Sequence, residues 1–313
     1  MTWNIRLTEI ADLLNAELHG NDAIMTGSKI DSRKIEAGDL FIALPGENTD
    51  GHDYIDQAYK AGACGALVNR YIPSELPQIV VKNVISAYGQ IARLCREKSQ
   101  ARIIAVTGSN GKTTLKEMIA SILGQCGKVL ATAGNLNNEL GVPLTLTRLN
   151  ENYDFAVIEM GANHAGEIAT LVAMAEPDVA VINNVGAAHL EGFGSLQGIA
   201  EAKGEIFAGL KAEGIGVINA DMPYVDLWKH ILGARQSLTF GLQQPADIAA
   251  LDLQPAITGS HFMVRLEGVC HFIFLPLPGI HNVSNALAAI AVCSALKIAP
   301  EAIVKGLASI KSV

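Results

Sequence analysis

Short apolar runs alternate with helical patterns along most of this 313-residue chain. Four of the runs are RIIAV (102–106), DFAVIEM (154–160), DVAVIN (178–183) and GIGVIN (214–219). The stretches between them carry apolar residues at helical spacing. Apolar strands joined by helices predict an α/β fold with a mostly parallel sheet and helices on both of its faces.

The first part of the chain predicts a smaller α/β unit. Helices are expected over 8–16 and 53–61, and strands over 39–44, 65–70 and 78–83. We therefore expect one domain at 1–83 and a second at 84–313, which opens with a helix over 84–98. In the second domain, 237–278 favours short strands and a minor β-region, and an Ala-rich helix follows over 283–299.

Composition excludes several classes of protein. Half of the residues are hydrophobic and 17% are charged, which is typical of a globular chain. The formal net charge of −8 argues against a general nucleic-acid binder. The five cysteines are scattered, so a reduced, cytoplasmic protein is expected. The N-terminus does not resemble a signal peptide, and no stretch predicts a membrane span.

The stretch TGSNGKTT (107–114) predicts a phosphate-binding loop, because it lies between a strand and a helix. Its glycines allow close backbone approach, Lys112 supplies positive charge, and the Thr113 hydroxyl can ligate Mg²⁺. The first glycine of the longer G-x-x-x-x-G-K-[ST] pattern is replaced by Val106, and the alternative is a glycine-rich turn with an exposed lysine. We expect nucleotide phosphates to contact Gly108, Ser109, Asn110, Gly111, Lys112, Thr113 and Thr114.

Two strand ends and one helix add candidate metal-site residues. Glu159 ends an apolar run, which places a carboxylate where Mg²⁺ can bind, although strand-end acids are often only structural. His189 follows the next strand and is a weaker candidate of the same kind. Lys203 lies on the apolar stripe of its helix, so it either extends its ammonium to solvent or turns it inward toward the metal.

Asparagines mark two further stretches. TAGNLNNELGVPLTL (132–146) contains Asn135, Asn137 and Asn138, which either form turns or contact a substrate. In PGIHNVSNALAA (278–289), Asn285 is expected to cap a helix, and Asn282 is a candidate for reading an adenine edge.

The order of TGSNGKTT, EMGA, HLEGFGS, AKGEIF and PGIHNVSNALAA resembles the Mur ligases, ATP-dependent amide ligases of bacterial cell-wall precursor synthesis. Within that family, GNLNNELGVP and DSRKIEAGDLFIALPGENTDGHD are similar to the member that joins D-alanyl-D-alanine to UDP-N-acetylmuramoyl-tripeptide. The resemblance extends along the whole chain. It implies a monomer whose first domain binds the UDP-linked substrate and whose central domain binds ATP.

The resemblance also implies roles for single residues. Thr113 and Glu159 would share one Mg²⁺, and His189 and Lys203 would lie near a second, with Lys203 carbamylated by CO₂. Lys112, Lys203 and His189 would serve catalysis. Nucleotide contacts would come from His281 and Asn282, and substrate contacts from Ser32, Arg33, Asn48, Thr49, Asn135, Asn137 and Asn138.

Mur ligases carry a third domain after the central one, and the sequence ends where the central domain is expected to end. We therefore expect a two-domain form with little or no turnover. The alternatives are a Mur ligase that adds a single amino acid, a folylpolyglutamate synthase, or a nucleotide-binding switch without chemistry. A switch would give no reason for Lys203 or for a substrate domain.

Overall fold

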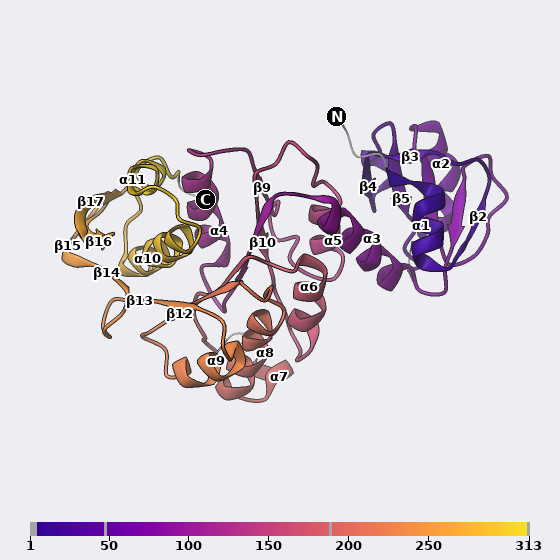
Figure 1. The fold of residues 1–313 in the computed structure, drawn as a ribbon. Coiled ribbons are helices and arrows are strands. Elements are labelled where there is room, and N and C mark those ends of the chain that lie inside the picture. Colours follow the sequence, from indigo (N-terminus) through magenta and orange to yellow (C-terminus); the bar gives the residue numbers. More distant parts are fainter. Residues whose placement is uncertain (1–4, 47–48, 188–189, 312–313) are drawn as a thin grey trace. The chain divides into compact units, whose positions relative to one another are not determined.

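The computed structural model describes residues 5–46, 49–187 and 190–311, without the side chains of 190 and 191. The chain divides into two compact units (Figure 1). The first comprises Met1–Gln100 and Pro143–Glu151, and the second comprises Ala101–Val142 and Asn152–Val313. The α/β class expected from the sequence is confirmed in both.

The first unit is built on a five-stranded sheet in the order β2-β7-β6-β5-β4. Its strands β4 to β7 are parallel and β2 is antiparallel to β7. The bounds are β1 (Ile5–Arg6), α1 (Leu7–Leu14), β2 (Glu17–His19), β3 (Ile24–Met25), β4 (Gly27–Lys29), β5 (Asp39–Ile42), α2 (Ile55–Lys60), β6 (Gly65–Val68), β7 (Gln78–Val80) and α3 (Val84–Lys98). Short 3₁₀ turns cover Ser32–Lys34 and Gly51–Tyr54.

Alternate residues of the central strands face opposite layers, as strand geometry requires. Leu40 and Ile42 lie in a core with residues of α1 and α3, whereas Phe41 lies in a core with residues of α2. Helix α3 was expected to open the second domain. It belongs to the first unit because Tyr88 and its other apolar residues are buried there.

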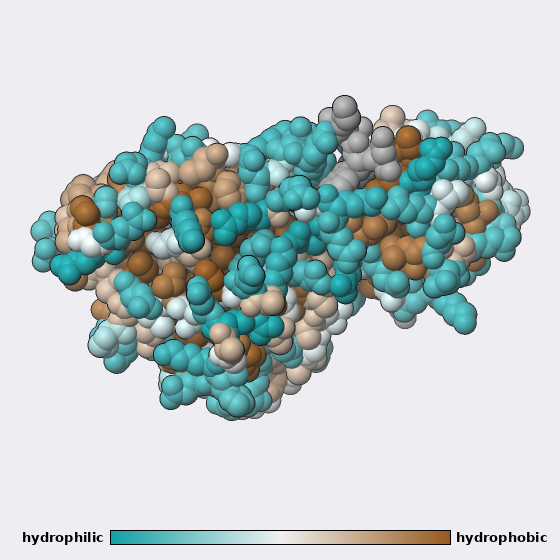
Figure 2. All heavy atoms as spheres, viewed as in Figure 1, coloured by the Kyte–Doolittle hydropathy of each residue, from teal (hydrophilic) through white to brown (hydrophobic). Residues whose placement is uncertain are grey.

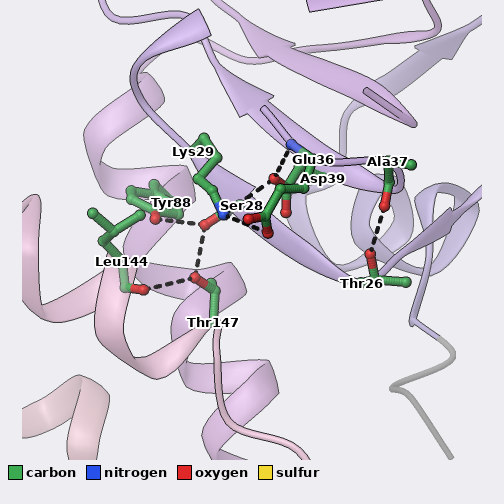
Figure 3. Close-up of polar contacts among 9 residues, drawn as sticks. All are labelled: Thr26, Ser28, Lys29, Glu36, Ala37, Asp39, Tyr88, Leu144 and Thr147. Carbon is green, nitrogen blue, oxygen red and sulfur yellow. Dashed lines mark hydrogen bonds and ion pairs between the residues drawn. The ribbon is translucent and has the colours of Figure 1, made fainter. Parts of the chain in front are cut away.

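A buried group of three hydroxyls joins the returning segment 143–151 to the first unit (Figure 3). The Ser28 hydroxyl lies 2.7 Å from the Tyr88 hydroxyl and 2.7 Å from that of Thr147. The Thr147 hydroxyl also donates to the Pro143 carbonyl at 3.0 Å. Burial raises the pKa of Tyr88, so its phenol stays protonated and can donate.

The second unit contains a parallel sheet of seven strands in the order β14-β13-β12-β11-β8-β10-β9. Its first elements are β8 (Arg102–Thr107), α4 (Lys112–Leu123), β9 (Val129–Ala131), β10 (Phe155–Glu159), α6 (Glu167–Ala175) and β11 (Val179–Ile182). Then follow α7 (Leu190–Phe193), α8 (Leu196–Ala208), β12 (Ile215–Asn219), α9 (Val225–Leu232), β13 (Ser237–Gly241) and β14 (Ile248–Ala249). Helix α5 (Gly141–Leu146) begins in this unit and continues into the first.

Helices α4 and α10 (Ile280–Ala295) contribute to the large apolar core on one face of this sheet, and α8 packs against β8 and β11. The four strands expected from apolar runs form β8, β10, β11 and β12. The expected helix over 283–299 ends at Ala295, and α11 (Pro300–Ala308) begins with a proline at its first turn. None of the helices within the described ranges is long and apolar enough to cross a membrane.

The expected β-region over 237–278 divides into two parts. Strands β13 and β14 extend the parallel sheet, whereas β15 (Leu251–Ala256), β16 (Gly259–Leu266) and β17 (Val269–Leu275) form a separate antiparallel sheet. One face of the small sheet enters the core through Phe262 and Ile273. Its other face exposes Phe272 and Phe274, and Figure 2 shows hydrophobic and hydrophilic surface interspersed over the second unit.

Candidate nucleotide and substrate sites

The phosphate loop connects the end of β8 to the start of α4. Gly111 has a φ of +73°, a conformation that favours glycine, and a Cβ there would lie 2.8 Å from the Asn285 Oδ1. The first hydrogen bond of the helix runs from the Leu115 N–H to the Gly111 carbonyl at 2.9 Å. Helix geometry therefore leaves the N–H groups of residues 112–114 directed out of the helix end, where they can bind an anion.

The tip of the loop is held by the segment that follows β11. The Asn110 N–H donates to the Asn184 Oδ1 at 2.9 Å, and the Asn184 Nδ2 donates to the Asn110 carbonyl at 2.9 Å. The Ser109 N–H donates to the Asn184 carbonyl at 3.0 Å. The N–H groups of Ser109 and Asn110 are therefore engaged within the protein in this structure.

The Lys112 ammonium lies close to the loop that it is expected to serve. Its Nζ donates to the Gly108 carbonyl at 2.9 Å. Burial lowers the pKa of Lys112, and the Glu159 carboxylate opposes that shift. The Lys112 ammonium therefore interacts electrostatically with the carboxylate at the end of β10.

Glu159 is the centre of the candidate metal site. It ends β10, its side chain is 1% exposed, and each of its carboxylate oxygens accepts one hydrogen bond. The Thr113 hydroxyl donates to Oε2 at 3.0 Å, and the Asn137 Nδ2 donates to Oε1 at 2.8 Å. Asn137 thus contacts the carboxylate of the candidate metal site, in addition to any role toward substrate.

These groups fit Mg²⁺, which proteins commonly hold through one or two carboxylates together with substrate phosphates and water. A hydroxyl and a carboxylate oxygen lie 3.0 Å apart beside a phosphate loop. No cluster of three His, Cys, Asp or Glu side chains occurs in the part of the chain that the structure describes.

Lys203 lies in α8 and is 4% exposed, so its side chain turns inward. Burial, with the Lys112 charge as a second cause, lowers the pKa of Lys203 to about 8. Among the described residues it has no hydrogen-bond or ion-pair partner. Its expected neighbour His189 lies outside the described residues.

A pocket of about 370 Å³ lies beside the phosphate loop. His281 and Asn285 line it from α10, and Asn219 and Asp221 line it from the end of β12. Asn285 lies within α10, five residues after its start, so it does not cap the helix. Its side chain is buried, and its Oδ1 accepts a hydrogen bond from the Asn183 Nδ2 at 2.8 Å. The Nδ2 of Asn282, the residue expected to read an adenine edge, donates to the Pro278 carbonyl at 2.8 Å.

The two remaining asparagines of the 132–146 stretch form no hydrogen bond to the Glu159 carboxylate, whose partners are Thr113 and Asn137. The Asn138 Oδ1 accepts from the Leu140 and Gly141 N–H groups, at 3.3 and 3.0 Å, and so orders the start of α5. Asn138 also lines a separate pocket of about 300 Å³. Asn135 is exposed.

The first unit has its own pocket, of about 600 Å³, lined by Ser32, Arg33, Thr49, Gly51, Tyr54 and Gln57 among others. The Ser32 hydroxyl donates to the Gln57 Oε1 at 3.2 Å. Hydrogen bonds from Arg33 lower the pKa of Asp31 to about 2, so both side chains are charged at neutral pH. Asn48 lies outside the described residues.

Residues that the sequence analysis did not select also shape these sites. Asn183, Asn184 and Asn219 each lie at or just after a strand end, the position that drew attention to Glu159. The strand-end argument alone could have identified them. No sequence signal marked Lys116, a fully buried lysine in α4.

Comparison with known proteins places the chain in a family. Residues 25–109 match the family model "Mur ligase family, catalytic domain", and residues 106–293 match "Mur ligase middle domain". The UDP-N-acetylmuramoyl-tripeptide–D-alanyl-D-alanine ligase of Escherichia coli (strain K12) is 46% identical, and the match covers 99% of this chain and 69% of that protein.

Two solved structures are also similar. A crystal structure of MurF from Acinetobacter baumannii has a TM-score of 0.92 at 35% identity, covering 100% of this chain and 69% of that one. A MurF ligase from Thermotoga maritima in complex with ADP has a TM-score of 0.81 at 32% identity, covering 92% of this chain and 66% of that one.

Proposed function

This chain belongs to the Mur ligase family, and we propose that it provides the nucleotide and UDP-substrate sites for joining D-alanyl-D-alanine to UDP-N-acetylmuramoyl-tripeptide. Family members are ATP-dependent ligases. The Escherichia coli relative is named as a ligase of these two substrates, and the product of the reaction would be a peptidoglycan precursor.

The observation that carries this proposal is the buried Glu159 carboxylate at the edge of the phosphate loop. Thr113 and Asn137 fix its two oxygens at 3.0 and 2.8 Å. A switch protein needs a nucleotide site, but it does not need a second pocket such as the one lined by Ser32 and Arg33. A nucleotide site together with a second pocket favours a ligase, in which the bound nucleotide activates a second bound substrate.

The proposed reaction activates a carboxylate. One carboxylate oxygen of the tripeptide attacks the γ-phosphorus of ATP, the bond to the bridging oxygen breaks, and ADP leaves. The amine of D-alanyl-D-alanine then attacks the acyl phosphate carbon, loses a proton, and expels inorganic phosphate. A bound Mg²⁺ would offset phosphate charge when present. Lys112 and the free N–H groups at the start of α4 would stabilise the same charge from the protein side.

The first unit would hold the UDP end of the substrate. The Arg33 guanidinium is 79% exposed and already forms two hydrogen bonds to Asp31, each 2.9 Å long. A guanidinium is well suited to a diphosphate, because its N–H groups bind pairs of phosphate oxygens. Ser32 and Thr49 would contribute neutral hydrogen-bonding groups to the same pocket.

Lys203 is a candidate for carbamylation. With a pKa of about 8, part of its side chain is a neutral amine near pH 8, the form that can attack CO₂. A bond forms between Nζ and the carbon of CO₂, and the nitrogen loses a proton, which leaves an anionic carbamate. ¹³C NMR in ¹³C-bicarbonate would detect a carbamate signal, and Lys203→Arg should lack it. A wild-type spectrum identical to that of Lys203→Arg would refute this part of the proposal.

The test of the main proposal is calorimetric binding to this chain. UDP-N-acetylmuramoyl-tripeptide should bind and UDP should compete with it, whereas a folate should not bind. Arg33→Met should weaken tripeptide binding about tenfold or more, since hydrogen bonds to charged groups contribute about 1.5–3 kcal/mol and about 1.4 kcal/mol is a factor of ten. The variant should leave ADP binding unchanged. A chain that binds ADP with Mg²⁺ but not the tripeptide would contradict the substrate assignment.

A further inference from the structure

Lys116 is a buried charge that the proposed reaction leaves unexplained. It lies in α4, one turn after Lys112, and its side chain is 1% exposed. Burying an ammonium costs free energy unless hydrogen bonds and opposite charge compensate. Here Nζ donates to the Thr132 carbonyl at 2.6 Å and lies 3.0 Å from the Glu117 Oε1.

The contact to Thr132 leads directly to Glu159. Thr132 follows the last residue of β9, and its N–H donates to the Val157 carbonyl at 3.0 Å. Its hydroxyl accepts a hydrogen bond from the Glu159 N–H at 3.0 Å. One residue therefore receives the Lys116 ammonium at its carbonyl and holds the Glu159 backbone with its hydroxyl.

The same two elements also hold the Glu159 carboxylate. Thr113, which contacts Oε2, lies on α4 one turn before Lys116. Asn137, which contacts Oε1, lies in the loop that begins at Thr132. Lys116 thus fastens the helix to the loop, and each of them supplies one contact to the carboxylate.

We propose that Lys116 is a positioning residue for the Glu159 carboxylate, acting through Thr132, and that it sets how tightly the site holds a divalent cation. The inference rests on the proposed Mg²⁺–nucleotide site. Groups that orient a metal ligand without touching the metal commonly change metal affinity 10- to 100-fold when they are replaced. A lysine that only joined two elements would affect stability without affecting the metal dependence of binding.

The experiment measures the dissociation constant of ADP with Mg²⁺ and with EDTA, and takes their ratio as the gain from magnesium. In Lys116→Met, which keeps the length of the side chain but removes its donors, the gain should fall about tenfold. The constant in EDTA should stay within about twofold, since the phosphate loop is unchanged. A gain equal to that of the wild type, or an equal loss with and without Mg²⁺, would overturn the inference.

Three matched variants complete the test. Glu117→Gln removes the negative charge beside Lys116 and should keep the wild-type gain. Thr132→Val removes the hydroxyl that holds Glu159 and should reduce the gain as Lys116→Met does, whereas Thr132→Ser should preserve it. If Lys116→Met fails to fold, the comparison of Thr132→Val with Thr132→Ser still tests the path through the Thr132 hydroxyl. Equal magnesium-dependent gains in these two variants would overturn the inference. A wild type without any gain would instead refute the proposed metal site.

Discussion

Replacement of Lys203 by methionine should stabilise the second unit, because the wild type buries a side chain that prefers to be charged. The pKa of Lys203 falls from an ordinary value of 10.5 to about 8, chiefly through burial. Each unit of pKa difference corresponds to about 1.4 kcal/mol, so the cost of the charged form is about 3 kcal/mol at neutral pH. Methionine has a similar length and no charge to desolvate.

The sign of the pH dependence follows from proton binding. Between pH 8 and 10.5 the unfolded chain holds a proton on Lys203 that the folded chain has released. The free energy of unfolding of the wild type therefore rises with pH across this window, relative to the variant. The advantage of Lys203→Met should be full below pH 8 and largely gone above pH 10.5.

Denaturant unfolding followed by the fluorescence of Trp228 would measure this difference. Trp228 is fully buried and its Nε1 donates to the Ala200 carbonyl of α8 at 2.9 Å, so it reports on the helix that carries Lys203. A Trp3→Phe background makes it the only tryptophan. The buffers should be free of CO₂, because a carbamate would change the charge.

Lys211→Met is the matched control. Its ammonium is 41% exposed and pairs with Asp178, so its loss should change stability by less than about 1 kcal/mol. A constant difference between wild type and Lys203→Met from pH 7 to pH 10.5 would refute the reasoning.

Other changes test the sites separately. Glu159→Gln should remove most of the magnesium-dependent gain in ADP affinity, measured by calorimetry, while binding in EDTA persists. Gly111→Ala forces a Cβ into a left-handed conformation near Asn285, so it should cost about 1–2 kcal/mol and weaken ADP binding with and without Mg²⁺. Tyr88→Phe should destabilise the first unit by about 1 kcal/mol, seen as faster hydrogen exchange in β4, because Ser28 loses one of its two hydroxyl partners.

The sequence alone determined the elements of the parallel sheet and the place of its phosphate loop. Buried parallel strands must be continuously apolar, and glycines must occupy the loop that approaches a phosphate, so both features are visible in local sequence. For Lys203 the sequence left two alternatives, an ammonium that extends to solvent or one that turns inward. Its 4% exposure decides for the inward one.

Tertiary structure decided which residues meet. Helix α3 belongs to the first unit, and segment 143–151 returns to it through the Thr147 hydroxyl, because contacts distant in sequence outweigh chain order. The Asn137 side chain contacts Glu159, and Asn285 lines the pocket beside the phosphate loop, although both asparagines also have ordinary local explanations as turn and cap residues. The burial of Lys116 could not be predicted from local sequence. Its ammonium is compensated by the carbonyl of Thr132, sixteen residues away, and only the folded chain brings that carbonyl to 2.6 Å.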